Sequence, residues 1–291
     1  MIITGANGVV GADLVKFFSK KNKVFAIYRT ENKINKNLKN KNIKWIKQDL
    51  SKGVLKNIKS KIIIHCAVAH TLSKKKNYSD IVNSNIIGLR NILIFAKKNK
   101  IKKIFHLSSV ALYGDIKSKI LRERNPFINP EFYGLTKILM EKMVESQNMN
   151  YLNIRLPGIV GYQINDPRRP WLCKILNKLK NGQKVEIFNS EKNFNNIIDS
   201  YEIYKFLEHL ILKKKFKSGS LNLSSNKPMK LSKIIYYMKE KLNSKSKLFF
   251  NKKKSKHFII SSKKVSSEYN YKPSNTKEII ERYIKDFVKA N

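Results

Sequence analysis

The chain has 291 residues, 42% of them hydrophobic, which is enough for one large domain with a buried core and a smaller lobe. Two cysteines, Cys66 and Cys173, argue against a disulfide framework, and no apolar run approaches the roughly 20 residues that a membrane span needs. We therefore expect a protein of the reducing cytoplasm with no membrane insertion, and a glycine loop that begins at Thr4 leaves no room for a signal peptide.

The formal net charge of +41 is compatible with a nucleic-acid binder, but the distribution of the charge argues against one. Only 8 of the 61 cationic residues are Arg and 53 are Lys. Lysine runs at 74–76, 213–215 and 252–254 are scattered and lack the interleaved aromatic residues that stack on bases. We interpret the lysines as a solvated surface and expect no specific nucleic-acid partner, although the same field would speed the arrival of an anionic substrate.

A short apolar strand, a glycine loop and a helical pattern open the chain. Residues 4–11 read Thr-Gly-Ala-Asn-Gly-Val-Val-Gly, with glycines at a spacing of three. Such a loop lets backbone N–H groups approach a pyrophosphate at the positive end of the following helix. The alternative is a glycine-rich turn that binds nothing. We expect the cofactor to contact the loop residues Thr4, Gly5, Asn7, Gly8, Val9 and Gly11.

The rest of the first half alternates between apolar strands and amphipathic helices. The expected strands are residues 24–28, 43–46, 62–66, 104–107 and 152–155. This alternation predicts an α/β fold with a doubly wound parallel sheet.

Arg29 follows the second strand, at the place where NAD-preferring sites usually carry an acid for the ribose 2′-hydroxyl. A guanidinium there can pair with the 2′-phosphate of NADP or lie over the adenine, and the alternative is an exposed arginine. We favour NADP without excluding NAD.

Tyr133 and Lys137 are four residues apart, so they share one helix face. An ammonium about 4 Å from a phenol is worth roughly 4 kcal/mol at an effective dielectric of about 20, which would lower the tyrosine pKa by about three units. Such a tyrosine could exchange a proton with an alcohol or a ketone. Ser109 lies just after the strand 104–107, at the end of the sheet where ligands bind, whereas Ser108 points to the opposite face.

After residue 161 the pattern changes. Helices are expected at 171–179, 201–212, 231–242 and 276–289, with short strands at 185–188 and 220–223. We expect a first domain at residues 1–160 and a smaller C-terminal α/β lobe for the substrate at residues 161–291.

The chain resembles the extended short-chain dehydrogenase/reductase family, whose members are often named NAD-dependent epimerases/dehydratases. The match extends in order over nearly the whole chain. It is carried by the glycine loop, Asp49-Leu50, His65-Cys66-Ala67, Asn85, Ser109 with Tyr113-Gly114, Tyr133 with Lys137, Arg155-Leu156-Pro157-Gly158, Asp199, Leu221-Asn222-Leu223 and Tyr271-Lys272-Pro273.

The resemblance implies a Rossmann-like first domain, to which segments near residues 195–205 of the lobe return. It also implies a homodimer, which is the state of family members. It implies that Ser109, Tyr133 and Lys137 are catalytic, with Lys137 also holding the nicotinamide ribose. Asn85 would support Lys137 through a water, although a purely structural role in its helix is the alternative. Further cofactor contacts are implied at Asp49, Leu50, Ala67 and Pro157.

The departures from the family pattern narrow the reaction. Val110-Ala111 stands where 4,6-dehydratases carry an acid pair and where GDP-fucose-forming enzymes need a cysteine. Gly158 stands where classical UDP-hexose 4-epimerases usually carry an Asn. We therefore expect hydride transfer at a secondary alcohol or ketone of a nucleotide-activated sugar, with a 4-ketoreductase favoured over a 4-epimerase, in polysaccharide biosynthesis.

Arg168 and Arg169 are the candidate substrate-binding residues, because a guanidinium can grip a diphosphate, and Arg122 and Arg124 are comparable candidates. The histidines show no metal-ligand spacing. The alternative function is a dinucleotide-binding redox sensor or scaffold without catalysis, which would have no need for Ser109, Tyr133 and Lys137 together.

Overall fold

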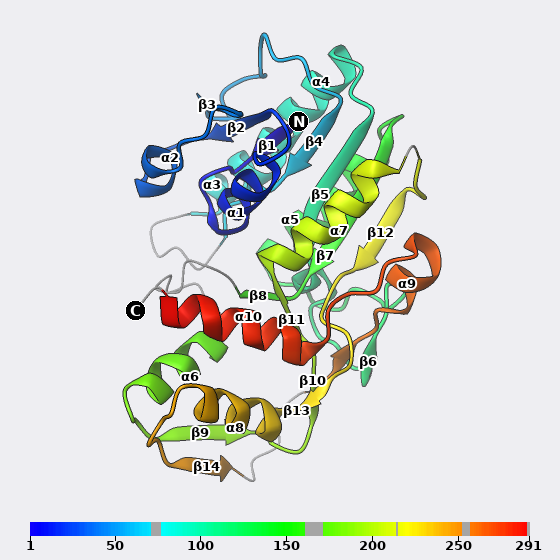
Figure 1. The fold of residues 1–291 in the computed structure, drawn as a ribbon. Helices are drawn as coiled ribbons and strands as arrows, with labels where there is room; N and C mark the ends of the chain where they lie inside the picture. The colour runs from blue at the N-terminus through cyan, green and yellow to red at the C-terminus, as the bar shows by residue number, and fades with distance from the viewer. Residues whose placement is uncertain (71–76, 161–170, 214, 252–256, 290–291) are drawn as a thin grey trace. The chain divides into compact units, whose positions relative to one another are not determined.

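The computed structural model describes residues 1–70, 77–160, 171–213, 215–251 and 257–289. The chain divides into two compact units, which are drawn in Figure 1. The first unit comprises Met1–Asp115, Pro126–Leu156 and Ile203–Leu221, and the second comprises Ile116–Asn125, Pro157–Glu202 and Asn222–Asn291. The first unit therefore contains Ser109, Tyr133 and Lys137 as well as Asn85.

A seven-stranded sheet forms the centre of the first unit (Figure 1). Its strands follow the spatial order β12-β7-β5-β4-β1-β2-β3. They are β1 (Ile2–Thr4), β2 (Val24–Tyr28), β3 (Ile43–Lys47), β4 (Ile62–His65), β5 (Lys103–Ser109), β7 (Asn150–Leu156) and β12 (Gly219–Asn222). The six strands from β7 to β3 pair in parallel. The predicted doubly wound parallel sheet is confirmed.

Helices α4 (Gly88–Lys98) and α5 (Phe132–Glu145) pack on one face of this sheet. Apolar strand residues meet them in a continuous core that includes Ile63, Ile104, Leu89 and Met140. Burial of β-branched and leucine side chains on that face contributes the main stabilisation of the unit.

Two helices far apart in the sequence pack together in the same unit. Phe17 and Phe18 of α1 (Val9–Phe18) lie with ring centres 5.2 and 4.9 Å from Tyr204 of α7 (Ser200–Leu212). The short helix α2 (Lys33–Asn37) connects β2 to β3.

The long helix that carries Asn85 is not a uniform α-helix. It begins as α3 (Tyr78–Val82), widens to a π-helix, η1 (Asn83–Ile87), and continues as α4. Asn77 caps its start by accepting from Asp80 N–H. A π-turn inside a helix commonly marks a functional position, and Asn85 lies within this one.

The described part of the second unit is built from pairs of short strands and from helices. The strand pairs are β8 (Gly158–Val160) with β11 (Ile197–Asp199), β9 (Val185–Phe188) with β14 (Leu248–Asn251), β10 (Asn193–Phe194) with β13 (Met229–Lys230), and β6 (Ile120–Leu121) with β15 (Ile259–Ile260). Helices α6 (Trp171–Lys180), α8 (Leu231–Lys241) and α10 (Thr276–Lys289) enclose a core that includes Leu176, Ile235 and Tyr283. The short helix α9 (Lys263–Tyr269) precedes α10. Helices α6, α8 and α10 match the predicted ones closely, whereas α9 was not predicted.

Across the described ranges, every helix is too short or too polar to cross a membrane.

Candidate active site

The glycine loop between β1 and α1 has a geometry that only glycine tolerates at two positions. Gly5 has a φ of +62°, and a Cβ there would lie 2.8 Å from the backbone of Ala67. A Cβ on Gly11 would overlap the carbonyl oxygen of Gly5. The loop therefore folds tightly against the exit of β4 and against the first turn of α1.

The first turn of α1 presents its backbone N–H groups without a side-chain cap. Gly8 occupies the N-cap position, Val9 is the first helical residue, and the first turn contains no acid. Asn7 anchors the loop, since its Nδ2 donates to Thr30 O over 2.6 Å and its own carbonyl accepts from Asn32 Nδ2 over 2.9 Å. This helix terminus is suited to an anion such as a phosphate.

The ends of β2 and β3 carry Arg29 and Asp49. Arg29 is exposed, and its Nη1 donates to Ser84 Oγ over 3.1 Å. Burial acts to raise the pKa of Asp49, but hydrogen bonds from the Ser51 hydroxyl and N–H, with the charge of Arg29, leave that pKa below its usual value. Leu50 is buried, and its carbonyl accepts from Asn91 Nδ2 over 2.7 Å. The adenosine-side residues expected from the sequence thus lie at adjacent strand ends.

The structure brings Ser109, Tyr133 and Lys137 together. Ser109 ends β5, and its side chain hydrogen-bonds the Tyr133 phenol. Lys137 lies one helical turn after Tyr133, with its Nζ 5.9 Å from the centre of the phenol ring. That Nζ donates to Leu107 O over 2.7 Å. A serine, a tyrosine and a lysine thus meet at the carboxyl end of β5.

The electrostatics of this trio differ from the sequence-based expectation. Burial raises the pKa of Tyr133 to about 12, with the Ser109 hydrogen bond acting in the opposite direction. Burial also lowers the pKa of Lys137 to about 8, against the attraction of Glu141 and Cys66. The sequence predicted that Lys137 would lower the tyrosine pKa. Desolvation outweighs that effect because the ammonium faces the Leu107 carbonyl rather than the phenol oxygen.

Close packing of α5 on the segment after β5 sets the position of Tyr133. That segment is a 3₁₀ turn, η2 (Val110–Tyr113). A Cβ on Gly134 would lie 2.5 Å from the carbonyl oxygen of Ala111 in this turn. Because Gly134 has no side chain, α5 can approach η2 closely enough for the Tyr133 phenol to reach Ser109.

Asn85 is fully buried and connects the loop after β4 to helix α5. Its Oδ1 accepts from Ala69 N–H over 2.7 Å, and its Nδ2 donates to Ala69 O and to Thr136 Oγ1, each over 3.1 Å. Thr136 in turn donates to Tyr133 O. Asn85 thus holds the β4 exit loop against the helix that carries Tyr133 and Lys137.

Three features near the trio were not anticipated from the sequence. The His70 ring lies 4.2 Å from the Tyr133 ring. Arg155 forms a buried ion pair with Glu141 at 2.8 Å and donates to the Tyr113 hydroxyl over 2.7 Å. Glu141 follows Lys137 by four residues, and this spacing was the available signal for a charged group beside the lysine.

Pro157 is buried and directly follows β7. The candidate substrate residues Arg168 and Arg169 lie outside the described residues.

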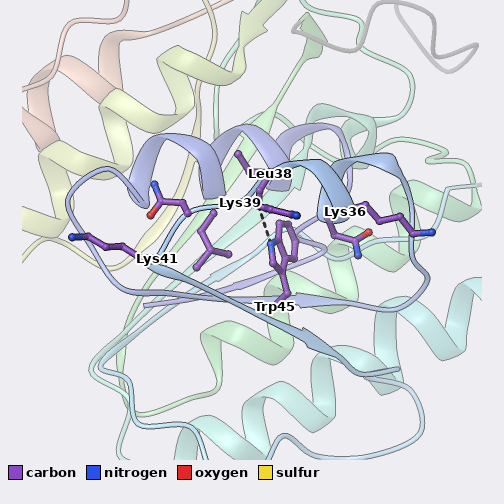
Figure 2. Close-up of a pocket in the computed structure, with 8 residues that line it drawn as sticks. Lys36, Leu38, Lys39, Lys41 and Trp45 are labelled. Carbon is purple, nitrogen blue, oxygen red and sulfur yellow. Dashed lines mark hydrogen bonds between the residues drawn. The ribbon is translucent and has the colours of Figure 1, made fainter.

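A pocket of about 560 Å³ lies between α2 and β3, as Figure 2 shows. Its lining comprises Asn35, Lys36, Leu38, Lys39, Asn40, Lys41, Ile43 and Trp45. The Trp45 indole donates to Leu38 O over 3.2 Å (Figure 2). None of the sequence-predicted site residues lines this pocket, so it is separate from the Ser109-Tyr133-Lys137 site.

A sequence model of the NAD dependent epimerase/dehydratase family matches residues 1–222. The chain belongs to this family. It is 27% identical over 279 residues to the uncharacterized protein MJ1055 of Methanocaldococcus jannaschii, covering 86% of this chain and 83% of that one. It is 26% identical over 196 residues to a UDP-glucose 4-epimerase of Halalkalibacterium halodurans, covering 60% of this chain and 58% of that one.

The fold is that of solved epimerases. The UDP-N-acetylglucosamine 4-epimerase of Methanobrevibacter ruminantium M1, in complex with UDP-N-acetylmuramic acid, superimposes with a TM-score of 0.85 at 23% identity, over 100% of this chain and 98% of that one.

The residues present fit the dinucleotide that the family uses. The loop has no room for a Cβ at Gly5 or Gly11. The uncapped first turn of α1 offers backbone N–H groups to a pyrophosphate. As a member of the NAD dependent epimerase/dehydratase family, the chain is an enzyme.

Proposed function

We propose that the chain is an NAD-dependent 4-epimerase of a nucleotide-linked sugar. The proposal rests on the contact between three residues at the carboxyl end of β5. Ser109 ends that strand, and Tyr133 and Lys137 lie one turn apart on α5. The relatives above that have a stated activity are 4-epimerases of UDP-sugars. The sequence alone favours a single reduction, and these relatives are our reason for placing epimerisation first.

Proton transfer is the task of the residues of this chain. A bound NAD would supply the hydride acceptor and donor for the sugar carbon, and return of the hydride to the opposite face of that carbon would give the epimer. Tyr133 removes the proton of the 4-hydroxyl and later gives it back, while Ser109 hydrogen-bonds the same oxygen. Lys137 lies one helical turn from Tyr133, and its pKa, which burial lowers to about 8, lets it exchange a proton near neutrality.

Binding roles follow from the position of each residue. The loop residues Thr4, Gly5, Asn7, Gly8, Val9 and Gly11 hold the pyrophosphate side of the cofactor. Asp49 and Leu50 hold the adenine side, and Ala67 and Pro157 the nicotinamide side. Asn85 acts through Ala69 and Thr136, so we assign it a positioning role.

A 4-ketoreductase that uses NADPH is the second candidate. It is favoured by Arg29, an exposed cation at the end of β2 where no acid is present. Gly158, in place of the epimerase asparagine, favours it too. Both candidates use the same trio, and they differ in whether the cofactor leaves after each turnover.

A homodimer through α4 and α5 belongs to the same proposal. Ile94, Leu135 and Leu139 expose 41%, 51% and 49% of their surfaces on these two helices. Large apolar side chains grouped on neighbouring helices are typical of a buried interface.

The bound nucleotide tests the proposal. The purified protein is denatured, the released dinucleotide is identified, and UDP-glucose and UDP-N-acetylglucosamine are assayed for their C4 epimers. We expect nearly stoichiometric NAD and epimer formation without added cofactor. An empty protein that binds NADPH reversibly and reduces a 4-keto sugar nucleotide would instead establish the second candidate.

Substitution of the phenol tests the residue assignment. Tyr133→Phe should lower kcat by about 10²- to 10⁴-fold without loss of bound dinucleotide, because only the proton-transfer group is removed. Tyr236→Phe, on the exposed surface of α8, is the matched control and should retain activity. Full turnover by Tyr133→Phe would refute the assigned chemistry.

A further inference from the structure

A row of buried polar side chains crosses the central sheet on the face that α5 covers. Thr4, His65, His106 and Asn153 are register partners on β1, β4, β5 and β7. All four are at most 1% exposed. Two positions earlier along three of these strands, the same face carries Ile2, Ile63 and Ile104 of the apolar core. Imidazoles in the middle of a parallel sheet need hydrogen-bond partners, because unpaired buried polar groups are costly.

The contacts of Asn153 determine the tautomer of His106. Nδ2 of Asn153 donates to Glu141 O over 3.5 Å and to Ser220 Oγ over 3.3 Å, so its Oδ1 faces His106 Nδ1 at 3.0 Å. An amide oxygen only accepts, so His106 Nδ1 carries a hydrogen. Burial, followed by the charge of Lys137, holds the pKa of His106 well below its usual value. The ring is therefore neutral, and its Nε2 is a bare acceptor.

The contacts of Thr4 give His65 the opposite tautomer. Thr4 Oγ1 accepts from Ala67 N–H over 3.2 Å and lies 2.8 Å from His65 Nδ1. Because the oxygen already accepts from the Ala67 amide, donation of the hydroxyl hydrogen to Nδ1 uses both functions of this group, and we assign Thr4 as the donor. Burial lowers the pKa of His65 to about 3, which keeps the ring neutral. The hydrogen of His65 is therefore on Nε2.

The two remaining nitrogens are complementary and face each other. The nitrogens of an imidazole point in nearly opposite directions. His65 directs Nδ1 towards β1, so its Nε2 points towards β5, and His106 directs Nδ1 towards β7, so its Nε2 points back towards β4. Both Nε2 atoms are buried without a partner among the described residues, and the ring centres are 6.0 Å apart. One nitrogen is a donor and the other an acceptor.

A bridge between the rings satisfies both groups. A direct bond of about 3 Å between the nitrogens would place the ring centres only about 5.3 Å apart, so the observed separation is too long for one. Ser108 Oγ, two residues after His106 on the same side of β5, is a third buried atom without a partner in the described part of the chain. Buried waters typically make about three hydrogen bonds to such groups.

We propose that His65 and His106 are a neutral pair of opposite tautomers, joined through one buried water that Ser108 also contacts. The pair completes a hydrogen-bonded line from the Glu141 carbonyl on α5, through Asn153, His106, His65 and Thr4, to the Ala67 amide. This line connects the helix that carries Tyr133 and Lys137 with the β4 exit loop. The histidines are positioning residues that set the distance between the proton-transfer group and the cofactor loop.

The tautomers are measured by ¹⁵N NMR of the full-length protein labelled at histidine. The chain has five histidines, and single His→Gln variants at 70, 209 and 257 complete the assignment. At pH 7 we expect His65 to carry its hydrogen on Nε2 and His106 on Nδ1. The same tautomer at both positions, or a charged ring at either, overturns the proposal. This measurement does not depend on the proposed reaction.

Two variants test the coupling. His106→Phe removes the acceptor, and the His65 Nε2 hydrogen should then lose its slow exchange with solvent. Thr4→Val removes the donor to His65 Nδ1 and leaves that nitrogen a bare, unpaired acceptor, so the ¹⁵N signal of Nδ1 should shift, whereas Thr4→Ser, the matched control, should keep the wild-type signal. A His65 signal that is the same in both Thr4 variants would refute the line.

Kinetics test the positioning role, which rests on the proposed function. His65→Asn should lower kcat about tenfold while KM for the sugar nucleotide stays within twofold, since small misplacements reduce the rate rather than substrate affinity. A rise in KM with unchanged kcat would overturn the positioning role. If the tautomers are as expected but the protein has no epimerase activity, the proposal for the histidine pair stands and only the proposed enzyme function is rejected.

Discussion

At the scale of single residues, burial governs the ionisation of the catalytic pair. Lys137 is almost fully buried, and its Nζ is satisfied by Leu107 O rather than by a carboxylate. Its pKa falls to about 8, while that of Tyr133 rises to about 12. A buried lysine without a salt-bridge partner destabilises the fold, so we interpret its retention as a requirement of the chemistry.

Lys137→Met should make this cost visible as a pH-dependent stability difference. The unfolded lysine titrates near 10.5 and the folded one near 8, so below pH 8 the charge costs the fold about 3 kcal/mol, and above 10.5 it costs nothing. We expect the variant to be more stable than the wild type at pH 7 and to lose this advantage between pH 8 and 10.5, as measured by urea unfolding. Activity should be lost. A stability difference that does not change with pH would contradict the assigned burial cost.

At the scale of elements, the approach of α5 to η2 places the phenol. Gly134 is the contact point, since its Cα faces Ala111 O, and the π-turn at Asn85 supplies a second fastening through Thr136. These are backbone arrangements, and they explain why a helix glycine sits beside a catalytic residue in spite of its poor helix propensity.

Gly134→Ala should therefore damage both stability and rate. The new Cβ would meet a carbonyl oxygen at 2.5 Å and push α5 away, so we expect a loss of about 1–3 kcal/mol and a fall in kcat of about 100-fold. Gly88→Ala is the matched control, because a Cβ at this helical glycine finds only ordinary contacts, the nearest at 3.6 Å from Leu50. It should be neutral or slightly stabilising in thermal unfolding. Equal behaviour of the two variants would exclude the packing explanation.

At the scale of the whole molecule, charge and apolar surface act in opposite directions on association. A net charge of +41 repels a second copy, most strongly at low salt. Leu135 and Leu139 lie exposed one turn apart on α5, and burial of their side chains would favour association with a second copy. We expect the apolar contact to prevail at physiological salt, where the repulsion between exposed charges is screened.

The double variant Leu135→Lys/Leu139→Lys should be a monomer. Light scattering after size exclusion in 150 mM salt is expected to give twice the 34.0 kDa chain mass for the wild type and a single chain mass for the variant. Leu212→Lys on α7, where the leucine is also exposed, is the control and should stay dimeric. A wild-type protein that is monomeric at every salt concentration would remove the dimer from the proposal.

Most of the fold could be predicted because its signals are local. Strand and helix positions follow from the spacing of apolar residues, and runs such as Ile62–His65 or the pattern of Thr276–Lys289 need no knowledge of their neighbours. The trio was found for a related reason, since the interval from Tyr133 to Lys137 is one helical turn. The excursion of Ile116–Asn125 into the second unit was not foreseen, because β6 forms only by pairing with β15, far along the chain.

The sequence by itself determined which residue types are available for proton transfer and the order of strands and helices that brings them to one sheet edge. Only the tertiary structure decided their ionisation and their partners. Whether Lys137 lowers the pKa of Tyr133 depends on where its Nζ points, and the tautomers of His65 and His106 depend on Thr4 and Asn153, which are 61 and 47 residues away. Desolvation and hydrogen-bond direction arise from the packing of distant segments, so the spacing of residues along the chain does not encode them.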